Sequence, residues 1–385
     1  MRPLIPVLLA AAALAEPAVP SPQAAWDTRA ALVLVGNLGR TSAGDAYEDT
    51  LASAHADPVH EGLAFGGAEL FGRMGRDWAD GRLEVVAAFH VDRHPGEPTE
   101  SELEELHAEW SRDALRFRAG IFQAPLGLTN TLHAHAWTFA NAPLFLGRFL
   151  GPDSLRNPGA QVAWEADPGK SLWTLAIQRA TGDTAFSFRA SHEGEAYLGR
   201  VHDAGLGSGP LVTLRNERAY RLGEGAALAS GVSVAAGDNA TGGATWIGAW
   251  DLEWRRERGE GRWVALESEL LYRDYEARAG LDSLGAPVAA DRLQDLAVAL
   301  SASAGLGDGW TAALRAERAV PLDRGAFEAA GRDADREART RLSPLVSWQA
   351  ADGLLLRLQY DHDRSPAFGT EDSVWLKVQW TLGRH

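Results

Sequence analysis

The sequence predicts an all-β fold: an antiparallel, up-and-down β-barrel of about 16 strands that spans a membrane. Three observations support this prediction. Apolar and polar side chains alternate along many short segments, long and short links alternate between those segments, and the N-terminus has the composition of an export signal. No segment approaches the roughly 18 consecutive apolar residues of a membrane-spanning helix. A barrel of about 14 strands is the alternative count.

The first residues resemble a short signal peptide. Arg2 supplies a positive charge, the stretch from Leu4 to Leu14 is apolar, and Ala13-Leu14-Ala15 fits a cleavage site built from small residues. We therefore expect residues 1–15 to be a signal peptide and residues 16–385 to form one barrel domain in the outer membrane of a Gram-negative bacterium. The alternative is a buried N-terminal helix.

Composition narrows the class of protein. The chain has 385 residues, no cysteine and a net charge of -15. An exported chain without disulfides needs another stabilising network, which barrel closure supplies. The absence of cysteine excludes thiol catalysis and cysteine-based zinc sites, and the acidic balance disfavours nucleic acid as a partner. The mean hydropathy of -0.20 fits a barrel, because only alternate residues face lipid.

The segment 374–382 shows the alternation clearly. Successive side chains of a strand point to opposite faces, so one face is expected to meet lipid and the other to line the lumen. The lipid-facing set is Val374, Leu376, Val378, Trp380 and Leu382, and the lumen-facing set is Trp375, Lys377, Gln379 and Thr381. The same pattern places Asp251, Glu253, Glu267 and Glu269 in the lumen.

The links between the strands also favour a barrel. Outer-membrane barrels have short periplasmic turns and longer external loops, with both termini in the periplasm. Tight turns are expected at 78–81, 111–113, 166–170, near 223, 259 and 307, and at 352–353. Longer links are expected at 39–61, 93–100, 123–156, 181–208, 237–243, 277–290, 321–337 and 364–372. A soluble β-sandwich would show the same alternation of side chains, but not this alternation of link lengths.

Small residues fill one predicted strand, at 226–236: Ala227, Ala229, Gly231, Ser233 and Ala235. Small inward side chains leave room for a loop that packs into the lumen. A compositional bias toward alanine and glycine is the alternative explanation.

Residues 102–160 carry a family resemblance. The motifs are Glu102-Leu103-Glu104-Glu105, Phe117–Phe122, Pro125–Leu128, His133–Phe139, Gly147–Gly151 and Leu155–Ala160. They resemble porin-like outer-membrane proteins that are labelled zinc-regulated or TonB-dependent receptors. A Gly-x-Phe-x-x-Pro-x-Gly pattern at 120–127 is more weakly similar to phosphate-selective porins. The resemblance implies an outer-membrane barrel whose expression is linked to zinc limitation. However, the chain is too short for the larger barrel and globular plug of a TonB-dependent receptor.

In porins, one long loop folds into the lumen and narrows it, and the resemblance implies this role for the 123–156 loop. We expect Arg148 and Arg156 to face acidic residues across the lumen, because rings of charge set ion selectivity. The acidic candidates are Glu105, Glu109, Asp251, Glu253, Glu267 and Glu269. The alternative is a set of ordinary solvated charges without a selective ring.

The same loop contains a candidate metal site. His133 and His135, with His107 and the loop histidines His55, His60, His90 and His94, supply imidazole groups that suit Zn²⁺. The alternative is that aromatic residues fold the loop inward and the histidines form local hydrogen bonds. No cofactor other than this zinc ion is expected.

These observations predict a passive channel for small hydrophilic solutes or ions, with outer-membrane lipid as its surroundings. A homotrimer is one option, although no trimer contact can be recognised in the sequence. Two alternatives are an outer-membrane receptor associated with zinc uptake and a plugged structural or adhesive barrel. No nucleophile elbow, phosphate-binding loop or zinc-protease motif is present, so the chain is not expected to be an enzyme.

Overall fold

The computed structural model describes most of the chain: residues 26–42, 62–78, 80–92, 99–151, 154–180, 183–188, 196–197, 200–201, 209–282, 284–323, 325, 336–366 and 369–384. The expected signal peptide, residues 1–15, lies outside the described residues, as do His55, His60 and His94. Across the described ranges, no helix is long and apolar enough to cross a membrane.

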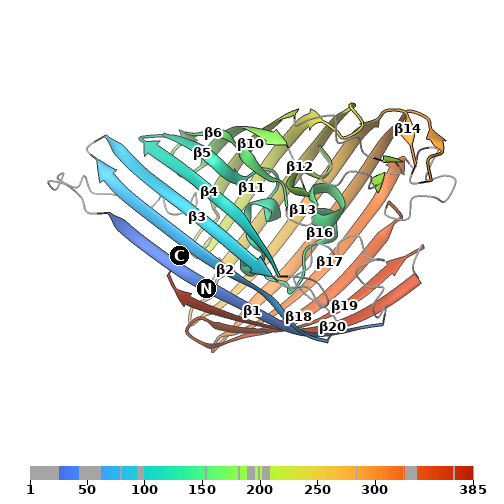
Figure 1. Ribbon diagram of the computed structural model, residues 1–385. Coiled ribbons are helices and arrows are strands. Elements are labelled where there is room, and N and C mark those ends of the chain that lie inside the picture. Colours follow the sequence, from blue (N-terminus) through green and yellow to red (C-terminus); the bar gives the residue numbers. More distant parts are fainter. Residues whose placement is uncertain are drawn as a thin grey trace.

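Sixteen antiparallel strands form one closed barrel, which confirms the predicted fold class and strand number. Figure 1 shows the tilted strands around a central lumen. The strands are β1 (Asp27–Thr41), β2 (Gly62–Trp78), β3 (Gly81–Asp92), β4 (Glu100–Arg112), β5 (Leu115–Gln123), β6 (Arg156–Asp167), β7 (Ser171–Ala180), β10 (Gly209–Arg221), β11 (Ala226–Asp238), β12 (Ala244–Glu257), β13 (Arg262–Ala277), β16 (Asp291–Gly307), β17 (Trp310–Asp323), β18 (Arg339–Ala351), β19 (Leu354–Ser365) and β20 (Gly369–Gly383).

The barrel closes where the first strand meets the last. β1 pairs with β20 in a register that runs from Ala31 opposite Gly383 to Thr41 opposite Ser373. The backbone N–H of Arg384 also donates to the carbonyl of Ala30 at 2.9 Å. The two ends of the described chain therefore lie side by side at one rim, as an even number of strands requires.

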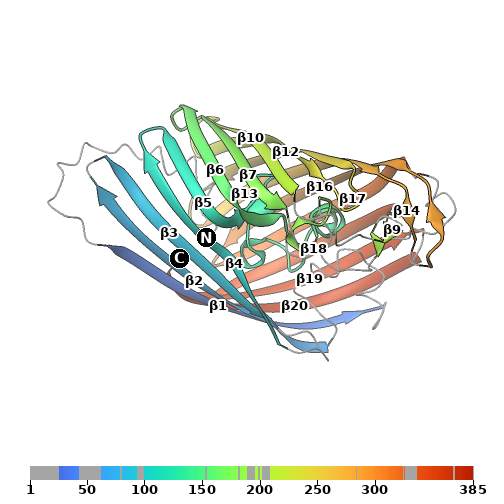
Figure 2. The ribbon, with the colours of Figure 1, turned by 45° about the horizontal axis from the view of Figure 1, so that its top comes forward.

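Short elements occupy the longer links. β8 (Ala196–Tyr197) pairs with β9 (Arg200–Val201), and β14 (Gly280–Leu281) pairs with β15 (Pro287–Val288). The 3-10 turn η7 (Asp183–Ala185) precedes β8. The link between β5 and β6 contains the 3-10 turns η4 (Thr129–Thr131) and η5 (Ala134–Ala136) and a π-turn, η6 (Leu146–Leu150). Figure 2 shows this link inside the barrel wall.

The predicted alternation of link lengths is present, with two corrections. The expected longer link at 237–243 is reduced to residues 239–243, because β11 extends to Asp238 and β12 begins at Ala244. Each expected tight turn joins two consecutive strands, and Asp113 and Gly353 adopt the positive φ that such turns require (50° and 75°). The expected link at 364–372 is much shorter, because β19 and β20 pair as far as Ser365 opposite Gly369. Only residues 366–368 lie between those two strands.

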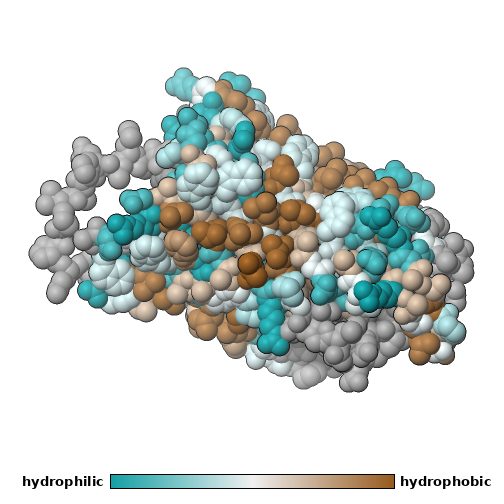
Figure 3. Space-filling view, turned by 90° about the horizontal axis from the view of Figure 1, so that it is seen from above, coloured by the Kyte–Doolittle hydropathy of each residue, from teal (hydrophilic) through white to brown (hydrophobic). Residues whose placement is uncertain are grey.

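The two faces of the wall also follow the prediction. On β20, Val374 and Trp380 are 46% and 49% exposed on the outer face, whereas Trp375 and Lys377 are buried in the lumen. Figure 3 shows an apolar area across one side of the molecule, between more polar ends. Outward tryptophans gather beside the short turns, where Trp310 and Trp348 stack with ring centroids 5.4 Å apart. Amphipathic rings favour this position at a membrane interface.

The two faces should respond differently to an introduced charge. Leu300 lies in the middle of β16 and is 53% exposed on the outer face, whereas Ser303 of the same strand faces the lumen opposite Ala265. Leu300→Arg is expected to lower the free energy of unfolding by about 2–4 kcal/mol, because it places a charge in the hydrocarbon. Ser303→Arg, the matched control, should cost less than about 1 kcal/mol. Denaturant unfolding in lipid vesicles measures both, and equal costs would contradict the assignment of faces.

Candidate pore constriction

The lumen loop, defined here as residues 124–155, leaves the wall at the end of β5 and returns at the start of β6. Its apolar side chains pack against inward-facing residues of the wall and are removed from water. The loop contributes Ala124, Leu126, Trp137, Ala142, Leu144, Phe145, Leu146, Phe149, Leu150 and Leu155, and the wall contributes Ala180, Leu211, Ala235, Ile247, Ala249, Leu271, Ala297 and Ala319. The loop is thus fixed to the β7–β17 side of the barrel by a hydrophobic core inside the lumen.

The small residues of β11 make room for this packing, as their pattern predicts. Ala235 is fully buried under the loop, and the backbone N–H of Gly127 donates to the hydroxyl of Ser233 at 2.9 Å. A larger side chain at either wall position would hold the loop away from the strand.

Acidic and amide side chains of the wall accept the loop's backbone N–H groups. The carboxylate of Glu269 accepts from the N–H of Leu128 (2.9 Å), the N–H of Thr129 (3.1 Å) and the Thr129 hydroxyl (2.6 Å). The other contacts are Ala140 N–H to Gln359 at 2.7 Å and Leu144 N–H to Glu317 at 2.8 Å. Glu269 therefore anchors the loop.

Cationic side chains of β17–β20 donate to the loop's carbonyl oxygens. The contacts are Arg315 to Asn141 (3.1 Å), Arg341 to Ala142 (3.3 Å), Arg357 to Trp137 (3.0 Å) and Lys377 to Ala140 (3.1 Å). Irregular backbone is tolerated at membrane depth only where protein or water satisfies its polar groups. This wall provides the partners for a loop that has almost no regular hydrogen bonding of its own.

Arg148 anchors the far end of the loop. Its guanidinium lies 3.2 Å from Asp295, which also pairs with Arg273 (2.8 Å) and Arg336 (3.2 Å), and all four side chains are buried. Arg148 also donates to the carbonyl of Glu337 at 2.9 Å. Its charge is consequently held between the loop and the wall.

Arg156 is similarly occupied. It begins β6, is 3% exposed, and pairs with Glu102 and, at 3.8 Å, with Glu104. The structure therefore does not arrange Arg148 and Arg156 opposite Glu105, Glu109, Asp251 and Glu267 across an open lumen. A buried charge needs a close partner, and each arginine takes the nearest carboxylate.

The acidic candidates divide by their surroundings. Glu109 pairs with Arg118 at 2.8 Å, Asp251 with Arg215 at 2.7 Å, and Glu105 lies 3.5 Å from His133. Glu267 and Glu253 keep partial exposure on the lumen face, and Glu267 accepts a hydrogen bond from Ser301 at 3.2 Å. Glu267 is the candidate best placed to meet a passing solute.

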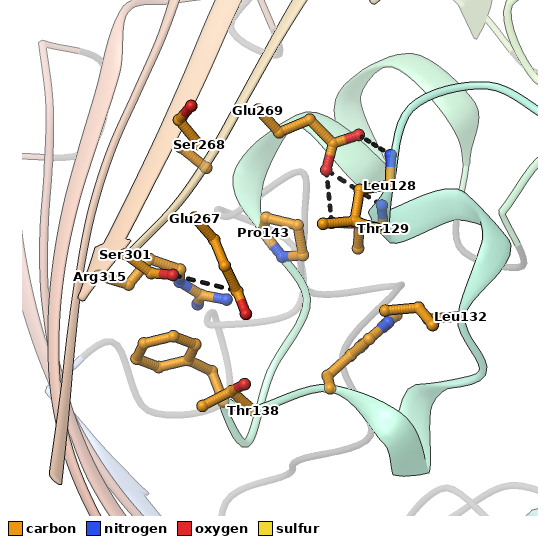
Figure 4. A pocket seen from close by; sticks show the side chains of 13 residues that line it. Leu128, Thr129, Leu132, Thr138, Pro143, Glu267, Ser268, Glu269, Ser301 and Arg315 are labelled. Carbon is orange, nitrogen blue, oxygen red and sulfur yellow. Dashed lines mark hydrogen bonds between the residues drawn. The ribbon is translucent and has the colours of Figure 1, made fainter. Parts of the chain in front are cut away.

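A recess lies between the loop and the wall of β13, β16 and β17. It is a cavity of about 70 Å³ whose lining includes Glu267, Ser301, Arg315, Thr138 and Phe139. Figure 4 shows the Glu267 carboxylate beside Ser301 and Arg315, with Thr138 of the loop across from them. The recess therefore offers a partly exposed carboxylate to a small polar molecule, because the Arg315 guanidinium beside it is buried and already donates to the carbonyl of Asn141.

His133 and His135 meet the opposite wall. The His133 Nδ1 lies 3.1 Å from Glu104, and the His135 Nδ1 contacts Glu69. Burial disfavours the charged form of His133, but the hydrogen bonds and negative charges of Glu104 and Glu105 outweigh it and raise its pKa to about 10. The loop is thus held to β2 and β4 by contacts between histidine rings and carboxylates.

A β-bulge brings two consecutive glutamates to this contact. Ala88 pairs with Glu105, and the next residue, Phe89, pairs with Leu103, so Glu104 is an extra residue on β4. A bulge redirects side chains that strict alternation would place on opposite faces. Sequence alternation alone did not predict that Glu104 would join Glu105 at the loop.

Several residues of this site were not singled out from the sequence. They are Glu69, Glu104, Arg215, Arg273, Asp295, Arg315, Glu317, Arg341, Arg357, Gln359 and Asp361. In the sequence, these residues can be recognised only as charged or amide side chains at alternate, inward-facing positions of strands. That pattern does not reveal which of them the loop will cover.

Comparisons with solved structures agree with this architecture. The outer membrane channel DcaP of Acinetobacter baumannii superposes with a TM-score of 0.60 at 11% identity, over 93% of this chain and 97% of that chain. OmpT, an outer membrane protein of Vibrio cholerae, gives 0.59 at 9% identity, over 93% and 100%. OprB of Pseudomonas putida gives 0.56 at 10% identity, over 93% and 94%. No family model matches the chain, and no curated protein matches it in sequence.

The fold is that of a porin-like barrel. A closed antiparallel barrel with an apolar exterior is the β-architecture that crosses outer membranes, so the chain lies in the outer membrane of a Gram-negative bacterium. The finer resemblance to zinc-regulated, TonB-labelled or phosphate-selective proteins rests on the sequence motifs alone.

Removing the acceptor at Glu269 should loosen the loop locally. Glu269→Ala leaves the N–H groups of Leu128 and Thr129 without their carboxylate, at a cost of about 1–3 kcal/mol. Hydrogen exchange of a peptide covering 124–132 should therefore accelerate by about 10- to 100-fold. Glu165→Ala is the matched control, because Glu165 pairs with Arg116 on the wall. Unchanged exchange in Glu269→Ala would contradict the anchoring role.

Proposed function

We propose that this protein is a passive channel for small hydrophilic solutes or ions, narrowed by the lumen loop, and that it is not an enzyme. The observation that supports this most strongly is the fixed position of the loop inside the barrel, held by paired side chains from β2 to β20. A closed wall with a rigid inward loop selects by size and charge and requires no chemical step.

The expected selectivity follows from the charges that stay near water. Arginine and lysine side chains of β17–β20 are used to hold loop carbonyls, whereas Glu267 borders the recess and is partly exposed. With a net charge of -15 on the chain, we propose a preference for cations or for small neutral solutes.

Charge reversal at the recess tests this proposal. In a planar bilayer, the purified protein should show stepwise conductance, and Glu267→Lys should shift the reversal potential in a salt gradient toward anions, because a cation then borders the passage. Glu224→Lys changes the net charge equally but lies in the exposed turn between β10 and β11, so its reversal potential should match the wild type.

The same recordings, together with a zinc-transport assay in vesicles, separate the two alternatives. Electrical silence from a folded, heat-modifiable barrel would overturn the channel and favour a plugged structural or adhesive barrel. Conductance that is unaffected by Glu267→Lys would keep the channel but remove the recess from its path. An outer-membrane receptor for zinc uptake would be favoured only by zinc transport into vesicles in the absence of general conductance.

A homotrimer remains a proposal for this chain. OmpT of Vibrio cholerae has a structure in a trimer form. Native mass spectrometry of the detergent-purified protein distinguishes a monomer from a trimer.

A further inference from the structure

The lumen loop meets β2 and β4 through a group of metal-ligating side chains that the channel function does not use. This His–Glu cluster consists of Glu69 on β2, Glu104 and Glu105 on β4, and His133 and His135 of the loop. One oxygen each from Glu69 and Glu104 and one ring nitrogen of His133 lie within 4.8 Å of one another. The two imidazole rings stack with centroids 5.8 Å apart.

The chemistry of the cluster suits a divalent transition metal better than Mg²⁺ or Ca²⁺. Imidazole nitrogen combined with carboxylate oxygen is a common zinc ligand set, whereas the hard cations prefer oxygen alone. Tetrahedral zinc bonds of about 2.0–2.2 Å place ligand atoms roughly 3.4 Å apart. Side-chain rotations that move the ligand atoms by about an ångström would therefore bring them to zinc-binding distance. The cluster holds three carboxylates, and the nearby guanidinium groups of Arg156 and Arg118 balance only part of that negative charge.

The backbone is shaped to bring these groups together. The bulge at Glu104 allows two adjacent glutamates to reach the loop. A third imidazole approaches from β3, where His90 Nδ1 lies 3.8 Å from Glu104. The His90 ring packs over Gly67, where a Cβ would lie only 2.4 Å from His90 Nε2. The bulge at Glu104 and the absence of a side chain at Gly67 thus allow ligating side chains to gather at one point of contact with the loop.

We propose that Glu69, Glu104 and His133 bind a divalent transition-metal ion, with Zn²⁺ as the expected occupant, and that Glu105 and His135 complete or support the site. Without metal, the His133 ring lies between the carboxylates of Glu104 and Glu105. An incoming cation takes the same partners, and the coordinating ring nitrogen carries no proton in the metal-bound form. The ion then ties the loop to β2 and β4.

Zinc binding to the full-length protein in detergent, at neutral pH, tests the proposal. Calorimetric titration with ZnCl₂ should give one saturable site per chain, and His133→Ala should weaken binding by at least about tenfold. Excess Mg²⁺ should not compete. His362→Ala is the matched control, because His362 pairs with Asp372 elsewhere on the barrel and should not alter binding. A wild-type protein that binds no zinc, or a His133→Ala protein that binds it equally well, would overturn the proposal.

A second measurement covers the case in which His133→Ala fails to fold. Glu104→Gln preserves the shape of the side chain and should also weaken zinc binding. X-ray absorption of the zinc-loaded wild type needs no substitution and should show the multiple scattering of an imidazole ligand, whose absence would overturn the site. Because these readouts measure binding and not current, the site and the channel can fail independently of each other.

Discussion

Inside a bilayer, each backbone N–H and C=O must find its partner within the protein, and this requirement governs the whole structure. The strands satisfy it by pairing around a closed ring, with β1 joined to β20. The lumen loop cannot satisfy it in the same way, since only short 3-10 and π-turns interrupt the irregular backbone of its described residues. The wall therefore supplies side chains as partners.

This requirement explains why so many charged residues of the lumen are not available to solutes. Glu269 and Glu317 accept loop N–H groups, while Arg315, Arg341 and Lys377 donate to loop carbonyls. Asp295 neutralises part of a buried group of three arginines. Charge in a porin-like lumen thus has two uses, and a charge that fixes the loop is no longer free to select ions.

The loop also connects two chemically different sides of the barrel. On the β7–β17 side it is held by apolar packing over small residues such as Ala235 and Ala249. On the β2–β4 side it is held by His133 and His135 against carboxylates. The first attachment also includes the buried Arg148–Asp295 ion pair, whereas the second is the one that a metal could strengthen. The position of the loop, and with it the width of the passage, depends on both.

The fold could be predicted from the sequence because the signals are local and repeated. Alternation places Lys377 inward and Trp380 outward, and tight turns such as Asp113 and Gly353 mark where strands reverse. The candidate site was predicted less completely. Inward placement of Glu267 and Glu269 follows from alternation, but the burial of Glu269 under the loop does not.

Arg148 and Arg156 show most directly what could not be predicted from the sequence. The sequence indicates that they are long cations in a loop that enters the lumen, but their partners, Asp295 and Glu102, are 147 and 54 residues away. The position of Glu104 could not be predicted for another reason, since one inserted residue in a strand changes the direction of its side chain.

The sequence by itself determined the closed barrel, its faces and its turns, because the period of the side chains and the chemistry of the turns act over a few residues. Only the tertiary structure decided which charges are paired, because pairing depends on how the loop packs across distant strands.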